Sequence, residues 1–129
     1  MKVRVLKQLP AGGYFLSAID FKTLEGESTM PAYIIAQVTI HDPVEYEKYM
    51  AGVGPTFAPF QARVLVAADE VEVFEGSWPR TRTVVLEFPS AEQAKGWYQS
   101  PAYQSILQHR LKAANSNLVL APGFEPPQR

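Results

Sequence analysis

Two segments rich in β-branched and aromatic residues each end at a helix-start signal, and this repeated pattern restricts the fold more than any other feature. The first segment, 32–40, runs into Asp42-Pro43, and the second, 82–88, is followed by Ser90 after one Pro. An Asp or Ser side chain can accept from the free N–H groups of a first helical turn, and Pro suits the first helical position. We therefore expect two strand-to-helix units.

The helices predicted after these strands carry apolar residues at helical spacing. The first begins at Pro43, and its inner face is formed by Tyr46, Tyr49, Met50 and Val53. The second begins after Ser90 and is broken at Ser100-Pro101, where the cap-then-Pro signal recurs. A longer helix then runs from Pro101 to about Ala114. Its predicted inner stripe consists of Tyr103, Ile106, Leu107, Arg110, Leu111 and Ala114.

The remaining strands complete the order. Segment 63–67 predicts a second strand that continues at 71–75 after a turn, 82–88 predicts a third strand, and 118–121 predicts a last short one. Strand, helix, strand, strand, helix, strand is the ferredoxin-like β-α-β-β-α-β order. The predicted fold class is α+β, with a four-stranded antiparallel sheet and both helices on one face.

The third predicted strand is apolar on both faces, since Val84 and Leu86 point one way and Val85 the other. A sheet with helices on one face should alternate to polar residues on the other. A large apolar face usually marks an interface. We therefore predict a homodimer through the sheet face, because a second copy is the simplest cover.

Length and composition favour one domain and exclude several partners. The chain has 129 residues, a net charge of -1 and no cysteine. The balanced charge offers no electrostatic footprint for nucleic acid, and no apolar run approaches the roughly 18 to 20 residues that span a bilayer. The absence of thiols excludes disulfides and is compatible with a reducing cytoplasm. A soluble cytoplasmic protein is expected, without nucleic acid or membrane as partner.

Residues 1–29 allow three interpretations. A basic start followed by the apolar 14–19 faintly resembles a secretory signal, although it lacks a small-residue cleavage site. The same residues also fit a strand, turn and strand around 10–13. The favoured interpretation makes 26–29 a polar linker and Met30 the natural start. The expected division is an extension over 1–29, hairpin or loosely ordered, a ferredoxin-like domain over 30–124, and a tail over 125–129.

The segment from Tyr33 to Phe124 resembles the domain of unknown function 1330 family, which belongs with the dimeric α/β-barrel proteins. The resemblance rests on Asp42-Pro43, Tyr46, Tyr49, Phe60, Arg63, Glu75-Gly76, Trp78, the tract Glu87 to Ser90, the tract Trp97 to Tyr103, and Arg110. It implies the ferredoxin-like fold and a dimeric α/β barrel, with no established activity. The family usually carries a Gly pair where this chain has Gln61-Ala62.

Charged residues on strands and the inner helix face are candidates for a site. Arg63, Glu75 and Arg110, together with Arg82 and Glu87, can converge on the cleft between sheet and helices. An arginine there suits a carboxylate or enolate, because the guanidinium holds two oxygens and stays charged. The alternative is a structural ion pair, such as Arg63 or Arg110 with Glu75 or Glu87.

Aromatic residues divide into core and pocket candidates. Core packing is the default at helical spacing and fits Tyr46, Trp97 and Tyr103. In contrast, Tyr49, Trp78 and Tyr98 lie near a loop or at the margin of the apolar stripe. They are predicted to bind a flat, partly apolar ligand.

The histidines offer limited chemistry. His41 precedes a helix and could move a proton near neutral pH, while His109 fits solvated helix surface. Neither has a visible triad partner, and two isolated histidines do not make a metal site. The segment 52–55 lacks the length and the lysine of a phosphate loop. No metal and no cofactor are predicted.

The predicted function is binding of a small organic acid or aromatic molecule in the sheet-helix cleft. Monooxygenases and isomerases of the wider barrel superfamily make a cofactor-independent enzyme compatible with the fold, by analogy only. In such an enzyme Arg63 or Arg110 would anchor the anion, and His41 or a tyrosine would move the proton. The alternative is a non-catalytic structural or assembly dimer with a filled core. The sequence leaves open whether any reaction is catalysed.

Overall fold

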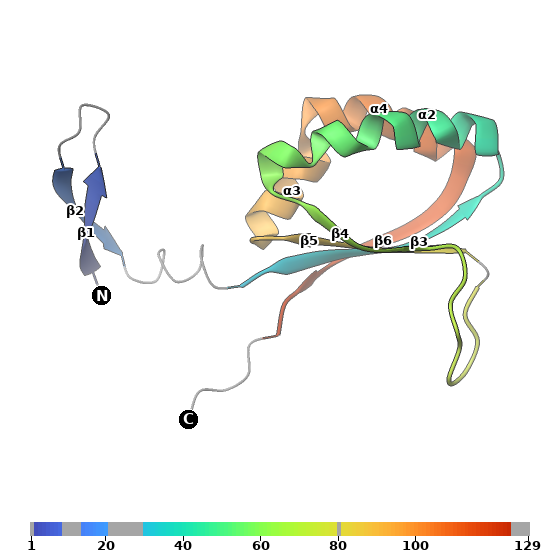
Figure 1. Cartoon of the computed structure of the whole chain (residues 1–129), viewed down its shortest axis with the longest axis horizontal. Coiled ribbons are helices and arrows are strands. Elements are labelled where there is room, and N and C mark those ends of the chain that lie inside the picture. The colour runs from blue at the N-terminus through green and yellow to red at the C-terminus, as the bar shows by residue number, and fades with distance from the viewer. Residues whose placement is uncertain (1, 9–13, 21–29, 80, 125–129) are drawn as a thin grey trace.

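Four strands form one antiparallel sheet in the computed structural model, which describes residues 2–8, 14–20, 30–79 and 81–124. The strands are β3 (Ala32–Ile40), β4 (Arg63–Ala68), β5 (Arg82–Phe88) and β6 (Ala114–Pro122), in the order β4-β5-β3-β6. The helices are α2 (Pro43–Val53), α3 (Ala91–Gln99) and α4 (Pro101–Ala113), and all lie on one side of the sheet (Figure 1). The predicted ferredoxin-like α+β fold is confirmed.

The helices start where the capping signals predict. The Asp42 carboxylate accepts from the backbone N–H of Glu45 at 3.2 Å, and the hydroxyls of Ser90 and Ser100 accept in the same way from the third residue after each of them. Ser100 has an extended backbone between α3 and α4, because a residue before Pro is disfavoured in the helical region. This bend sets α4 apart from α3.

Two short 3₁₀ helices, η1 (Gly54–Thr56) and η2 (Ala58–Phe60), connect α2 to β4. The turn that ends η2 places Gln61 in the left-handed region at φ 56°, and no other non-glycine residue of the described chain has a positive φ. Gln61 and Ala62 stand where the family that this chain resembles usually carries a Gly pair. A side chain in this conformation costs roughly 1 to 2 kcal/mol relative to glycine.

The core lies between the helices and the inner face of the sheet. Alternate residues of β3 and β5 point toward the helices and are buried, among them Ile34, Val38 and Leu86. Trp97 of α3 and Tyr103 of α4 are fully buried, with ring centroids 4.0 Å apart. The sequence pattern predicted this packing for both aromatic residues.

Several sequence predictions are wrong in detail. Residues 71–75 form no strand, because the β4–β5 pairing ends at Ala68 with Thr83 and no described strand pairs with the chain beyond it. Strand β6 begins at Ala114 instead of 118, since it pairs with the whole of β3. Leu111 was expected on an inner helix face, but its side chain is exposed. Met50 is partly exposed as well, although it lies on the side of α2 that faces the sheet, as predicted.

The face of the sheet without helices carries an apolar row. Directly opposite residues of neighbouring strands share a face. Val66 pairs with Val85, Val85 with Ile35, and Ile35 with Val119, so this outer apolar row crosses all four strands. No helix of the described chain covers it (Figure 1).

Near the start of the chain, β1 (Lys2–Gln8) pairs antiparallel with β2 (Tyr14–Asp20). This is the arrangement that the strand, turn and strand interpretation expects. The predicted linker at 26–29 and the predicted tail at 125–129 lie outside the described residues. Among the helices of the described chain, none has the length and apolar character needed to cross a bilayer.

Candidate functional site

A cavity of about 280 Å³ lies between the inner face of the sheet and helices α2 and α4. No helix of the described chain packs closely on β4, so the cavity extends beside that strand at Val64 and Ala67. Most of its lining is apolar. The polar or aromatic side chains among its lining residues are Tyr46, Tyr49, Phe57, Arg82, Trp97, Tyr103 and Arg110. An apolar hollow with a few convergent polar groups is typical of small-molecule sites.

Arg110 is the most unusual residue of this cavity. Its side chain is buried at 4% exposure, and it belongs to no ion pair in the described chain. Its Nη2 donates to the Tyr103 hydroxyl at 3.4 Å, its guanidinium lies 5.7 Å from the Tyr49 ring centroid, and its Nε has no hydrogen-bond partner. Burying an unpaired charge is costly, so a counter-charge is expected at this point.

The hydroxyls of Tyr49 and Tyr103 lie 2.9 Å apart at the same place. Burial raises the pKa of Tyr49, and the neighbouring Tyr103 raises it further, so the phenol stays neutral at physiological pH. A hydroxyl oxygen has two acceptor positions, so the Tyr103 oxygen can accept from Arg110 whichever of the two tyrosines donates to the other. When Tyr103 donates to Tyr49, the Tyr49 O–H is free to donate to a ligand beside the guanidinium.

Arg82 brings a second guanidinium to the cavity lining, but this one is paired. Its Nε and Nη2 donate to the two carboxylate oxygens of Asp69 at 2.8 and 3.3 Å. The contact holds the pKa of the Asp69 carboxyl below its usual value. Arg82 also lies 5.6 Å from the Tyr46 ring centroid, and Tyr46 lies 5.5 Å from Tyr49. Each ring of this tyrosine pair therefore has a guanidinium over it, Arg82 over Tyr46 and Arg110 over Tyr49.

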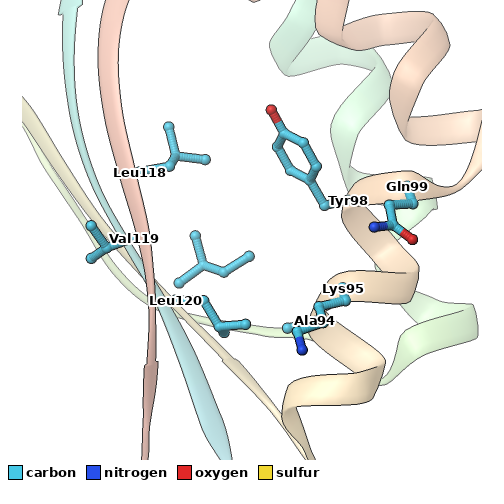
Figure 2. Close-up of a pocket in the computed structure, with 8 residues that line it drawn as sticks. Ala94, Lys95, Tyr98, Gln99, Leu118, Val119 and Leu120 are labelled. Atoms are coloured by element: carbon cyan, nitrogen blue, oxygen red, sulfur yellow. The ribbon is translucent and has the colours of Figure 1, made fainter.

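Tyr98 lies in a second hollow of about 230 Å³ between α3 and β6. Figure 2 shows Tyr98 extending from α3 into the space between α3 and β6, with Leu118 on the facing side of the strand and Val119 pointing the opposite way. Ile34 and Leu118 line both hollows. Tyr98 is thus a neighbour of the main cavity, 5.5 Å from Tyr103 between ring centroids, and not part of its lining.

Arg63 lies outside the cavity. Its Nη2 is 2.7 Å from a carboxylate oxygen of Glu87, and Glu87 also accepts from the Tyr33 hydroxyl at 3.1 Å. These three residues occupy opposite positions on β4, β5 and β3, on the face without helices. The structural ion pair that was the alternative prediction for Arg63 is therefore present.

The other candidates are also separate from the cavity. Glu75 and Trp78 are exposed in the β4–β5 connection, which extends away from the end of the sheet (Figure 1), and the Trp78 indole donates to Thr83 at 3.2 Å. His41 is exposed between β3 and α2. Of the residues predicted for a site, the structure places Tyr49, Arg82 and Arg110 in the lining of this cavity.

Two of the tyrosines that line the cavity were predicted to pack in the core. Tyr46 and Tyr103 fitted a core stripe, because helical spacing does not distinguish a packed ring from one that borders a hollow. Arg82 was predicted to converge on the cleft with the other charged strand residues, and it lines the cavity. The sequence feature that places it there is its even number in β5, because the even-numbered Val84 and Leu86 also point inward.

The His109 imidazole contacts the Glu45 carboxylate at 2.5 Å, on the helix side away from the cavity lining. This hydrogen bond, and a second from Lys48, lower the pKa of Glu45. No third acid, histidine or cysteine joins the pair, and no group of three metal-ligating side chains occurs within residues 30–79 and 81–124.

The fold and the cavity together define a small ferredoxin-like α+β domain with a ligand-sized hollow under its helices. The chain belongs to the family described as domain of unknown function DUF1330, which matches residues 31–124. This confirms the resemblance noted from the sequence. Among curated proteins, none matches the chain.

Solved structures share the fold. A protein of unknown function from Rhodopseudomonas palustris is 18% identical, with 82% of this chain and 92% of that chain covered and a TM-score of 0.62. SnoaB, a cofactor-independent oxygenase from Streptomyces nogalater, is 15% identical, with coverage of 77% and 95% and a TM-score of 0.51. A dimeric ferredoxin-like protein of unknown function from Thermobifida fusca is 14% identical, with coverage of 70% and 89% and a TM-score of 0.50. At these identities the similarity concerns the fold.

Proposed function

We propose that the protein binds a small organic acid with an apolar or aromatic body in the cavity under its helices. The observation that carries this proposal is the buried guanidinium of Arg110, which has no ion-pair partner in the described chain and an unpartnered Nε. A carboxylate or enolate oxygen pair would supply the missing counter-charge through the guanidinium fork. The Tyr49 hydroxyl would donate a further hydrogen bond.

The lining supports the apolar part of the ligand. Aliphatic side chains from the sheet form one wall, and the rings of Tyr46 and Trp97 border the other. A hollow of about 280 Å³ accommodates a body of benzoate or hexanoate size. The same hollow argues against the alternative of a filled core.

The tyrosines favour binding over proton abstraction. A general base works best with a pKa near the operating pH, whereas burial moves the pKa of Tyr49 upward, away from that range. His41, the other candidate for moving a proton, does not line the cavity. A cofactor-independent enzyme, as SnoaB is described, remains the second candidate, in which Tyr49 would polarise a ligand oxygen without removing a proton.

We also propose that two copies pair through the outer apolar row and form a dimeric α/β barrel. Ile35 and Val119, two members of this row, are exposed, and such a contiguous apolar face is usually an interface. The Thermobifida fusca protein with the same fold is described as dimeric. A second copy on this face would leave the cavity, which lies on the helix side, free for ligand.

A panel of carboxylic acids tests the binding role by thermal shift, with wild type and Arg110→Gln compared in parallel. We expect aromatic or medium-chain monocarboxylates to raise the unfolding temperature of wild type and to leave the variant unchanged. Acids that stabilise the protein are then followed for consumption, because turnover would establish the enzyme and binding without turnover would establish the binder. A panel that stabilises neither protein would contradict the proposal.

A further inference from the structure

We propose that Asp69 sets the charge selectivity of the cavity. Because it pairs with Arg82, the cavity prefers an acid with one negative charge over an acid with two. This inference rests on the proposed function of the cavity. It concerns the guanidinium of Arg82, which has no part in the proposed anchoring of the ligand by Arg110.

Two guanidiniums line the cavity, and they differ in their pairing. Arg110 has no carboxylate partner, whereas Arg82 holds both oxygens of Asp69. No Asp or Glu belongs to the lining itself. With Asp69 in place, the site therefore presents one uncompensated positive charge to a ligand.

Asp69 reaches Arg82 from outside the cavity. It follows the last residue of β4 and borders a separate surface hollow with Trp78 and Thr81. Its side chain is 72% exposed, while that of Arg82 is 22% exposed. The carboxylate thus neutralises the guanidinium at the surface without filling space that a ligand would use.

Two neighbouring tyrosine rings connect the two guanidiniums. Arg82 lies over Tyr46, Tyr46 neighbours Tyr49, and Arg110 lies over Tyr49, with successive separations of 5.6, 5.5 and 5.7 Å. A ligand anchored at Arg110 and extended along these rings would bring its far end toward Arg82.

The charge at that far end then decides how tightly the ligand binds. An apolar end packs against Met50, Tyr46 and neighbouring side chains at no electrostatic cost. A second carboxylate would need to displace Asp69 from Arg82 or remain unpaired in an apolar lining, and both are unfavourable. Without the Asp69 charge, Arg82 would be free to pair with the second carboxylate.

Matched pairs of acids test this role by calorimetric titration. Benzoate against terephthalate, and hexanoate against adipate, differ mainly in the second carboxylate. For wild type we expect the monocarboxylate of each pair to bind at least tenfold more tightly. For Asp69→Asn, and equally for Asp69→Ala, we expect this ratio to fall by about tenfold or more, mainly through tighter binding of the dicarboxylate.

Two variants serve as controls. Glu70→Gln removes the same charge from the next residue, which has no ion pair with Arg82, and should leave the ratio within about twofold of wild type. Adding Arg82→Gln to Asp69→Asn should restore the wild-type ratio, since the freed guanidinium is then absent. Thermal unfolding of each variant checks that it is folded.

The outcomes separate the two proposals. If no monocarboxylate binds wild type, or if binding survives Arg110→Gln, the proposed function fails and the charge role of Asp69 fails with it. If Arg110→Gln abolishes binding but Asp69→Asn leaves the ratio unchanged, only the role of Asp69 is overturned. A ratio that Glu70→Gln changes as much as Asp69→Asn would also overturn it, because the effect would then be a general loss of negative charge.

Discussion

The Nη2 of Arg110 lies 3.4 Å from the hydroxyl of Tyr103, which in turn lies 2.9 Å from the hydroxyl of Tyr49. These three residues come from two helices, α4 and α2, that pack side by side over the sheet. The Tyr103 oxygen accepts from the guanidinium, and either phenol can donate in the hydrogen bond between the two tyrosines. This arrangement satisfies one donor of a buried cation, whose Nε has no hydrogen-bond partner in the described chain.

Tyr103→Phe tests the structural side of this relationship. The substitution keeps the ring in the core but removes the acceptor for Arg110, and a buried charged donor without a partner is unfavourable. We expect a loss of about 1 to 3 kcal/mol in the free energy of unfolding, measured by urea denaturation. The matched control is Tyr98→Phe, whose hydroxyl has no hydrogen bond in the described chain; its expected change stays within about 0.5 kcal/mol. Equal effects of the two substitutions would contradict the assignment.

Stability at alkaline pH should depend on Tyr49. Its pKa is raised in the folded state above the ordinary value of 10.0, so the folded protein keeps a proton that the unfolded chain releases. The stabilisation is therefore complete below about pH 10 and is lost as the pH rises above it. We expect wild type to lose more stability than Tyr49→Phe between pH 8 and pH 11 in urea denaturation. The same loss in both proteins would show that Tyr49 is not responsible.

Gln61 provides a test of backbone strain. Because its φ of 56° favours glycine, Gln61→Gly should raise the free energy of unfolding by up to about 1 kcal/mol, after the greater flexibility of glycine in the unfolded chain is subtracted. Ala62→Gly, at a neighbour without positive φ, should lower stability. If both substitutions are destabilising to the same degree, the turn is not strained at Gln61.

The sequence was sufficient to predict most of the fold, because caps and periodicity are local signals. Asp42, Ser90 and Ser100 each begin a helix in the structure, as predicted. What the sequence did not reveal depends on pairing between distant segments. Residues 71–75 are β-branched enough for a strand but have no described partner, and Asn115 is unlike a strand residue yet pairs with Thr39.

The site was predicted in part for a similar reason. Arg110 was placed on an inner helix face by its spacing, and the structure buries it there. Arg63 was expected in the same cleft, but its position opposite Glu87 puts it on the outer face. The strand alternation could have indicated this, because Glu87 is an odd-numbered residue of β5 and the apolar residues that face the helices are even-numbered. That a hollow exists beneath Tyr46 and Tyr103 could be learned only from the packing of the helices.

The proposed dimer can be tested with one exposed residue of the outer apolar row. Val119→Glu places a charge in this row, whereas Val44→Glu places the same charge on an exposed position of α2. In light scattering at micromolar concentration we expect twice the monomer mass of 14.4 kDa for wild type and for Val44→Glu, and a shift toward the monomer for Val119→Glu. A wild-type mass near 14.4 kDa would refute the dimer.

The most direct test of the ligand-binding account is the dissociation constant of benzoate or hexanoate for wild type, Arg110→Gln and Arg63→Gln, measured by isothermal titration calorimetry. Both substitutions remove one arginine charge, but only Arg110 lines the cavity. We expect the Arg110 variant to bind at least tenfold more weakly, a change of about 1.4 kcal/mol, and the Arg63 variant to bind as wild type does. Binding that is unaffected by Arg110→Gln, or equally weakened by both substitutions, would contradict the account.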